Sequence, residues 1–288
     1  MVISVVQLGT LDYATGLRLQ QRLVELRKSD QIGNVLLLLE HSPVITLGRN
    51  ARRNNVLASD DVLKQRGVEL FECDRGGDVT YHGPGQLVGY PIFDLRSFLG
   101  TDGRRKTLGA VEFVRRLEEA LIRTCADFGI GSERVAGMTG VWTELATGAR
   151  SPVGGTVQSK IAAIGVHVSR GVTSHGFALN VTNQPLEYFQ LIVPCGIATK
   201  PVTSIQNQLS KNAIPSKDAD ASKDPHPTRI PSLDDVAQSA ARNFGRVFNS
   251  QIVWVDSLDA LLGRKVGVPA RAPEELRKLT GENDTFWT

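Results

Sequence analysis

The order of strand-like and helix-like segments constrains the fold of this chain more than any other feature. Short apolar segments of strand character alternate irregularly with amphipathic helices, without a strict strand–helix–strand repeat. Such an order favours an α+β fold, with a mixed β-sheet flanked by helices, over a doubly wound parallel sheet. The predicted strands span residues 3–7, 34–40, 44–47, 68–72, 87–93, 139–145, 160–169, 176–181 and 251–255, and the predicted helices span 13–29, 108–128 and 233–248.

The length of 288 residues is compatible with one large domain or two small ones, and we predict a single domain over residues 1–288. Residues 210–231 contain several prolines among alternating lysine and aspartate residues, with almost no apolar side chains. Because a segment of this composition cannot bury a core, we predict a disordered polar insert there. The residues after about 256 are predicted to form a C-terminal extension.

Charge and composition argue against several classes of protein. The net charge of +3 is too small to indicate a nucleic-acid-binding surface. The longest apolar run, residues 35–39, is far too short to span a bilayer, and the N-terminus lacks the basic and apolar regions of a signal peptide. The three cysteines follow no disulfide or zinc pattern, which favours a reducing compartment. We therefore expect a soluble cytoplasmic protein that binds neither nucleic acid nor membranes.

The most informative stretch is residues 75–86, which read RGGDVTYHGPGQ. Glycine permits backbone conformations and close approaches that a side chain would block. The stretch is therefore predicted to be a loop that lies against a ligand, although a set of tight turns would have the same composition. It is not a phosphate-binding loop, because no Gly-Lys-Ser/Thr follows the glycines, and it lacks the spacing of a dinucleotide fingerprint.

The three cysteines differ in their sequence surroundings. Cys125 lies within a predicted amphipathic helix and is expected to be buried, as free cysteines commonly are. Cys73 lies at a strand end, whereas Cys195 lies between proline and glycine, on a turn that can present its sulfur. Lys160 opens a strongly apolar strand. Most lysines are solvated surface charges, but an ammonium close to a thiol stabilises the thiolate and can exchange protons with reacting groups.

Together these residues resemble the lipoyl(octanoyl) transferase family, the ATP-independent enzymes of lipoate assembly. Residues 75–86 match the family signature R-G-G-x-x-T-aromatic-H-x-x-G-Q in every defined position. Further blocks agree in the same order over roughly two-thirds of the chain, which is more specific than any single motif. These blocks are EHSPVITLGR (40–49), GVW (140–142), KIAAIG (160–165), GFALN (176–180), PCGI (194–197) and VTS (202–204).

The resemblance implies a biotin/lipoate-protein-ligase-like fold and the transfer of octanoyl from octanoyl-acyl carrier protein, through a thioester on Cys195, to a lysine of a lipoyl domain. The implied acceptors are the lipoyl domains of 2-oxoacid dehydrogenases and the glycine cleavage H protein. Lys160 would lower the pKa of the Cys195 thiol, and neither a cofactor nor a metal would be required. The residues implied to line the acyl site are Arg75, Gly76, Gly77, Asp78, Val79, Thr80, Tyr81, His82, Ala163, Ile164, Gly165, Gly176, Phe177 and Ala178.

Two other functions are compatible with such a fold. An ATP-dependent lipoate or biotin ligase would use a lysine to bind the adenylate and would need no cysteine. A catalytically silent relative would only bind acylated or lipoylated proteins. The presence of Cys195 and the form of the loop that begins at Arg75 favour the transferase over the ligase, and the pair Cys195 and Lys160 favours it over the silent binder.

Overall fold

The computed structural model describes residues 1–98, 107–144, 157–196, 200–212 and 229–262, with only the backbone of Cys195, Lys211 and Asn212. Its large sheet contains β1 (Val2–Leu11), β2 (Asn34–His41), β6 (Gln86–Ile92), β7 (Glu133–Val135), β8 (Met138–Glu144), β9 (Gln158–Ser169), β10 (Val172–Asn180) and β11 (Gln251–Trp254). Their order across the sheet is β11-β1-β2-β6-β10-β9-β8-β7. β1 is parallel to β2 and β11, whereas the other neighbours pair antiparallel. The predicted mixed sheet is therefore confirmed.

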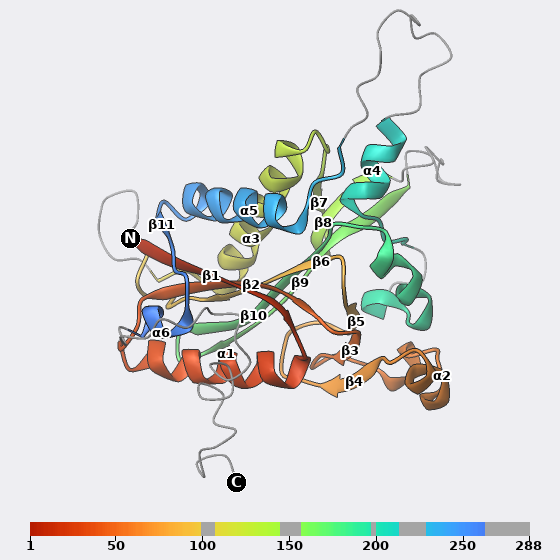
Figure 1. The fold of residues 1–288 in the computed structure, drawn as a ribbon, viewed down its shortest axis with the longest axis horizontal. Coiled ribbons are helices and arrows are strands. Elements are labelled where there is room, and N and C mark those ends of the chain that lie inside the picture. Colours follow the sequence, from red (N-terminus) through yellow and green to blue (C-terminus); the bar gives the residue numbers. More distant parts are fainter. Residues whose placement is uncertain (99–106, 145–156, 197–199, 213–228, 263–288) are drawn as a thin grey trace, which may run out of the picture.

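A smaller sheet of three strands lies beside one end of the large sheet (Figure 1). It consists of β3 (Val44–Leu47) between β4 (Glu69–Glu72), which is parallel to it, and β5 (Val79–His82), which is antiparallel. Its apolar side chains form a separate core with residues of later segments, such as Phe189 and Ile192. Because β2 and β3 are separated by only two residues, the small sheet is held close to the large one.

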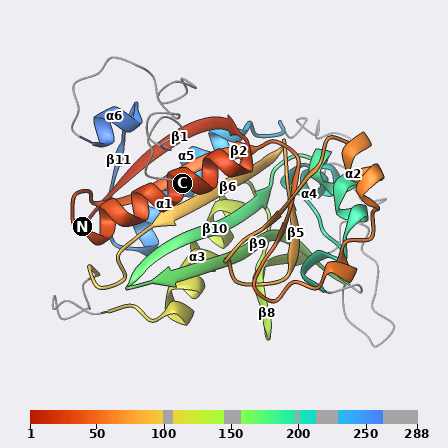
Figure 2. The same ribbon diagram turned by 90° about the horizontal axis from the view of Figure 1, so that it is seen from below.

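Helices cover both faces of the large sheet. α3 (Ala110–Asp127) and α5 (Leu233–Val247) pack on one face, and α1 (Tyr13–Lys28) lies across the other (Figures 1 and 2). β2 shows why both faces are buried: Leu36 and Leu38 join the core under α3 and α5, whereas Leu37 joins the core under α1. Since successive strand residues point to opposite faces, an uninterrupted apolar run is expected for a strand covered on both sides.

Local signals in the sequence fix where the main helices begin. The Asp12 side chain accepts a hydrogen bond from the Thr15 backbone N–H at the start of α1. Ser232 and Asp235 form a reciprocal capping box at the start of α5. The remaining helical segments are η1 (Arg53–Asn55), α2 (Asp60–Gln65), η2 (Gln184–Leu191), η3 (Pro194–Gly196), α4 (Ile205–Asn212) and α6 (Leu258–Leu261).

The structure changes three of the predicted boundaries. Residues 79–82 form β5, so the stretch predicted to be a loop contains a buried strand between two glycine-rich turns. Residues 210–212 end α4 and are not part of a disordered insert, while residues 213–228 lie outside the described residues. After residue 256 the chain continues into α6, whose Leu258 is fully buried against the core under α1. The rest of the predicted C-terminal extension, residues 263–288, also lies outside the described part.

Within the described residues, no helix combines the length and the apolar character needed to cross a membrane.

Candidate active site

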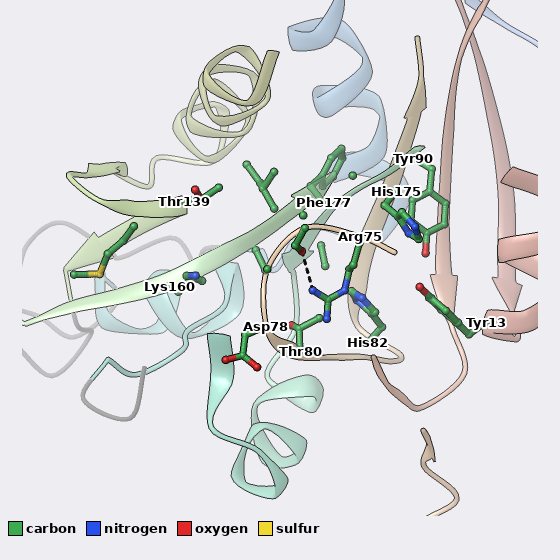
Figure 3. A pocket seen from close by; sticks show the side chains of 18 of the residues that line it. Tyr13, Arg75, Asp78, Thr80, His82, Tyr90, Thr139, Lys160, His175 and Phe177 are labelled. Carbon is green, nitrogen blue, oxygen red and sulfur yellow. Dashed lines mark hydrogen bonds between the residues drawn. The ribbon is translucent and has the colours of Figure 1, made fainter. Parts of the chain in front are cut away.

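A cavity of about 220 Å³ lies between the β9–β10 ladder and the chain from Arg75 to His82 (Figure 3). Lys160 lies toward one end of this cavity, and Tyr13, Tyr90 and His175 lie toward the other. Most of the residues implied by the family resemblance line it. They are Arg75, Gly76, Gly77, Asp78, Thr80, His82, Lys160, Ala163, Ile164, Gly165, Gly176, Phe177 and Ala178.

Small residues on β9 and β10 let the glycine-rich loop at residues 75–78 approach the large sheet. Gly165 pairs with Gly176 across the ladder, and the Gly76 backbone N–H donates a 3.0 Å hydrogen bond to the Val166 carbonyl oxygen. A Cβ atom on Gly165 would lie 2.5 Å from the carbonyl oxygen of Gly76. The close approach therefore requires glycine at 165, and it forms one wall of the cavity.

Arg75 supports this loop with its guanidinium group. Its Nε donates to Thr46 Oγ1 at 3.0 Å and its Nη2 to the Thr46 carbonyl oxygen at 2.6 Å, while Nη1 donates to the Gly76 carbonyl oxygen at 3.1 Å. The residue is 7% exposed. A planar group with several donors can satisfy such a fork of acceptors, which lysine cannot. The side chain lines the cavity, and its hydrogen bonds also fix the loop to β3.

Two of the residues implied to bind substrate, Val79 and Tyr81, lie away from the cavity. They alternate along β5 with Thr80 and His82, so their side chains point to the opposite face. There both are buried in the core of the small sheet, where Tyr81 stacks on Tyr188 with ring centroids 4.8 Å apart. They belong to the signature segment as packing residues, and Thr80 and His82 face the cavity.

Lys160 is tied by its backbone to the segment that follows Cys195. Its N–H donates to the Pro201 carbonyl oxygen, and its own carbonyl oxygen accepts from Thr203, each at 2.9 Å. Its side chain lines the cavity with the Nζ atom 4.7 Å from the centroid of the Trp142 ring. An ammonium over an indole face is attracted by the ring quadrupole, so Trp142 stabilises this position of the charge.

The turn that carries Cys195 is η3, and it is held against the cavity wall. The Val193 N–H donates a 2.7 Å hydrogen bond to the Asn55 carbonyl oxygen. Gly196 has a φ of +68°, and a Cβ atom on it would lie 2.5 Å from Asp78 Oδ2. The backbone next to Cys195 therefore lies beside Asp78, which lines the cavity. The Cys195 side chain itself lies outside the described part of the structure, so its pairing with Lys160 stays a prediction.

A chain of buried amides joins the sequence blocks that the family shares. Gln86 Nε2 donates to Asn180 Oδ1 at 2.9 Å, and Asn180 Nδ2 donates to the Thr203 carbonyl oxygen at 2.8 Å. Through the hydrogen bond of Thr203 with Lys160, this chain links β6 and β10 to the start of β9. These polar residues hold the strands and the segment after Cys195 in register.

Sequence reasoning missed the residues that close the cavity. They are Tyr13, Tyr90, Gly137, Met138, Thr139 and His175. Around Tyr13 and Tyr90, burial lowers the pKa of His82 well below its usual value and lowers that of His41 to about 4. The rings of Tyr13, His41, His82 and Tyr90 come from α1, β2, β5 and β6, respectively. Of these four residues, only His82 lies within the signature at residues 75–86. His175 directly precedes Gly176, which was predicted to line the site, but nothing in the sequence indicates that the backbone φ of His175 is +54°.

The other two cysteines do not line this cavity. Cys125 is fully buried in α3, as predicted, and burial raises the pKa of its thiol to about 12. Cys73 is partly exposed and its Sγ atom donates to the Leu47 carbonyl oxygen at 3.4 Å. No group of three or more His, Cys, Asp or Glu side chains in the described ranges is arranged to hold a metal ion.

Comparison with known proteins gives the family. The model of the lipoyl protein ligase A/B catalytic domain matches residues 12–221. The chain is 54% identical to an octanoyltransferase of Koribacter versatilis, over 96% of this chain and 97% of the relative. It is 57% identical to an octanoyltransferase of Acidobacterium capsulatum, over 91% of this chain and 96% of the relative. The chain belongs to the lipoyl protein ligase A/B family. Within it, the chain is an acyltransferase of the octanoyltransferase group.

Solved structures of lipoate-protein ligases share the fold. Lipoate-protein ligase A bound with ATP superimposes with a TM-score of 0.62 at 14% identity, covering 98% of this chain and 94% of that chain. A bi-partite lipoate protein ligase of Thermoplasma acidophilum, studied with its E2 lipoyl domain, gives a TM-score of 0.60 at 16% identity, covering 98% and 91%. The ligase-like fold implied by the sequence resemblance is thereby confirmed.

Proposed function

We propose that this acyltransferase moves octanoyl from octanoyl-acyl carrier protein to a lysine of lipoyl domains, through a thioester on Cys195. The acceptors are lipoyl domains of 2-oxoacid dehydrogenases and the glycine cleavage H protein. One observation carries the proposal: a cavity with small and apolar residues in its lining has Lys160 toward one end, and Asp78 in its wall lies beside Gly196 of the turn that holds Cys195. A reactive thiol requires reducing conditions, which supports a cytoplasmic location.

The interior of the cavity suits a saturated acyl chain. Ala163, Ile164, Phe177 and Ala178 supply its apolar surface, and Gly76 and Gly165 leave room for the chain. Burial of methylene groups against such a surface contributes about 0.8 kcal/mol each, so an eight-carbon chain is held mainly by its tail. The polar head of the thioester then remains near Lys160.

The proposed reaction consists of two acyl transfers. The Cys195 thiolate attacks the thioester carbonyl carbon, and the bond to the phosphopantetheine sulfur breaks as that sulfur takes a proton from Lys160. The neutral amine of the acceptor lysine then attacks the acyl-enzyme carbonyl carbon and forms the amide, its proton passes to the now neutral Lys160, and the bond to sulfur breaks to release the Cys195 thiolate. Two transfers through one covalent intermediate give ping-pong kinetics. A thioester is more activated than an amide, so this sequence requires no ATP.

An ATP-dependent ligase has the same fold, so the fold does not separate the two activities. More than half of the aligned residues are identical to proteins named octanoyltransferase, whereas the ATP-bound ligase is only 14% identical. The E2 lipoyl domain studied with the Thermoplasma ligase supports a lipoyl-domain acceptor for this chain as well.

The test is to supply an unmodified lipoyl domain with either octanoyl-acyl carrier protein without ATP, or free octanoate with ATP. Intact-protein mass spectrometry then measures how much of the lipoyl domain carries an octanoyl group. The proposal predicts octanoylation in the first reaction and none in the second. Modification only in the second reaction would identify a ligase, and modification in neither would indicate a silent binder.

A further inference from the structure

His175 separates the acyl cavity from a second space. This second space, of about 570 Å³, lies between α1 and the β9–β10 hairpin, and its lining includes Gln20, Cys73, Asp74 and His167. His175 also lines this second space. Among the described residues, it is the one that lines both the acyl cavity and the second space. The Asp74 side chain on this side is 57% exposed, so the second space faces solvent.

The structure holds the His175 ring in this dividing position at an energetic cost. Its φ of +54° lies in the left-handed region, which a residue with a Cβ rarely adopts. Gln20 Oε1 accepts a 2.7 Å hydrogen bond from the His175 backbone N–H, and Asp74 Oδ1 lies 2.7 Å from Nε2 of the ring. The side chain is only 3% exposed. Strained backbone that is held by several neighbours is typical of functional positions.

His175 also lies at the end of the cavity distant from Lys160. It pairs with Val166 across the ladder, six residues along β9 from Lys160. At about 3.4 Å per residue, the two ends are roughly 20 Å apart along the strand. An extended eight-carbon chain covers about 9 Å of this distance, given carbon–carbon bonds of about 1.5 Å. A twelve-carbon chain covers about 14 Å by the same measure, and the thioester group adds to either length, so the ω-end of a longer chain comes closer to the His175 ring.

We propose that His175 limits the length of the acyl chain by closing the cavity against the solvent-facing space. This inference rests on the proposed function, because it assumes that the acyl chain extends from Lys160 toward His175. Without the ring, the two spaces become continuous, and a chain of ten or twelve carbons passes its ω-end into the space beneath α1. Tyr13 and Tyr90 remain as the side walls of this exit.

The experiment compares wild type, His175→Gly and His175→Asn with hexanoyl-, octanoyl-, decanoyl- and dodecanoyl-acyl carrier protein. Glycine and asparagine both tolerate a positive φ, so either variant can keep the backbone, and thermal unfolding checks the fold. His167→Ala is the matched control, because His167 lies 3.5 Å from Asp74 and lines only the second space. We expect the ratio of dodecanoyl to octanoyl kcat/KM to rise by roughly tenfold or more in the His175 variants and to stay unchanged in the control.

A binding measurement separates this inference from the proposed function. Calorimetric titration with dodecanoate and octanoate reports on the closed end of the cavity without any transfer. If wild type transfers no octanoyl but His175→Gly gains affinity for dodecanoate over octanoate, the proposed function fails and the closure by His175 holds. If folded His175 variants keep the wild-type chain-length ratios in both measurements, with all rates reduced alike, His175 has only a structural role and the inference is overturned.

Discussion

Asn55 holds Asp78 and the turn of Cys195 at the same time. Its side-chain amide donates a 2.7 Å hydrogen bond to Asp78 Oδ2, and its carbonyl oxygen accepts a 2.7 Å hydrogen bond from the Val193 N–H. Asp78 Oδ1 in turn accepts from the Val79 N–H at 2.7 Å, at the start of β5. The cavity wall and the turn of the proposed nucleophile are therefore joined through one residue of η1.

Replacing Asn55 with alanine tests this link. The change removes the bond to Asp78 but keeps the carbonyl acceptor for Val193, so we expect a modest loss of stability, about 1–2 kcal/mol. Transfer should slow by roughly tenfold to a hundredfold, because a misplaced nucleophile loses its approach to the thioester. Arg53→Ala is the control: it lies in the same turn, but its side chain bonds the exposed Asp60. Equal rates in the two folded variants would show that the link does not position Cys195.

Lys160 is predicted to act on the Cys195 thiol through its charge and as a proton donor. The rate of thiol alkylation against pH should give a pKa below the value of about 8.5 for free cysteine. Lys160→Met should raise that pKa, while Lys160→Arg should keep it low. Arginine does not readily release a proton, so Lys160→Arg should alkylate quickly but transfer octanoyl slowly. The same thiol pKa in wild type and both variants would rule out the pairing.

Gly165 is predicted to be intolerant of any side chain. In Gly165→Ala the new methyl group meets the Gly76 carbonyl oxygen at 2.5 Å, and backbone atoms must move to relieve the contact. We expect a loss of about 1–3 kcal/mol in the free energy of unfolding, as for overpacked cores. Weaker octanoyl transfer should follow, because the displaced loop distorts the wall of the cavity. Gly131→Ala is the control, since a Cβ atom on Gly131 would meet no atom within 4 Å. Wild-type stability of Gly165→Ala in a denaturant titration would contradict the close approach.

The stability of the protein should fall on mild acidification. His41 Nδ1 lies 3.0 Å from the Leu11 carbonyl oxygen and Nε2 lies 2.6 Å from Tyr90 Oη, and burial lowers its pKa from about 6.5 to about 4. The folded state therefore favours the neutral ring, while the unfolded chain binds a proton below about pH 6.5. The stabilisation is fully present above that pH and is lost as the pH falls toward 4.

The expected loss from His41 is roughly 3 kcal/mol between pH 7 and pH 4, at about 1.4 kcal/mol per pKa unit. His82 adds to it in the same direction, because its pKa is also lowered by burial. Asp74 contributes only near the acid end of this window, because the hydrogen bond with His175 lowers its pKa from 3.8 to about 2 and the unfolded chain protonates it only near pH 4 and below. Denaturant titrations at several pH values measure the effect, with His41→Gln as a non-titrating comparison. A free energy of unfolding that is constant from pH 7 to pH 4.5 would contradict this account.

Local patterns predicted much of the fold. The helix that begins at Tyr13 is predictable from the helical spacing of its apolar residues, and the strand at 44–47 from a short apolar run between a proline break and a glycine. β5 was missed, since glycines on both sides of four buried residues make the whole stretch look like a loop. The order of strands in the sheet could not be predicted from the sequence either, because it depends on pairings between residues far apart in the chain.

The candidate site was predictable where its residues are continuous in sequence. Gly76, Gly77 and the segment around Gly165 were found because the family blocks contain them. Tyr13 and His175 were not found, because they come to line the same cavity only when α1 packs across β10. Val79 and Tyr81 show what a motif leaves open: it marks a segment, and the two-residue period of a strand then decides which side chains reach the cavity.

The covalent intermediate on Cys195 is the central claim, and peptide mapping after brief incubation with octanoyl-acyl carrier protein tests it most directly. After an acid quench and digestion, mass spectrometry should find octanoyl on the peptide that contains Cys195 and none on those that contain Cys73 or Cys125. Cys195→Ala should form no adduct and transfer no octanoyl to a lipoyl domain. Full turnover by Cys195→Ala, or an adduct on Cys73 that accounts for the transfer, would contradict the mechanism.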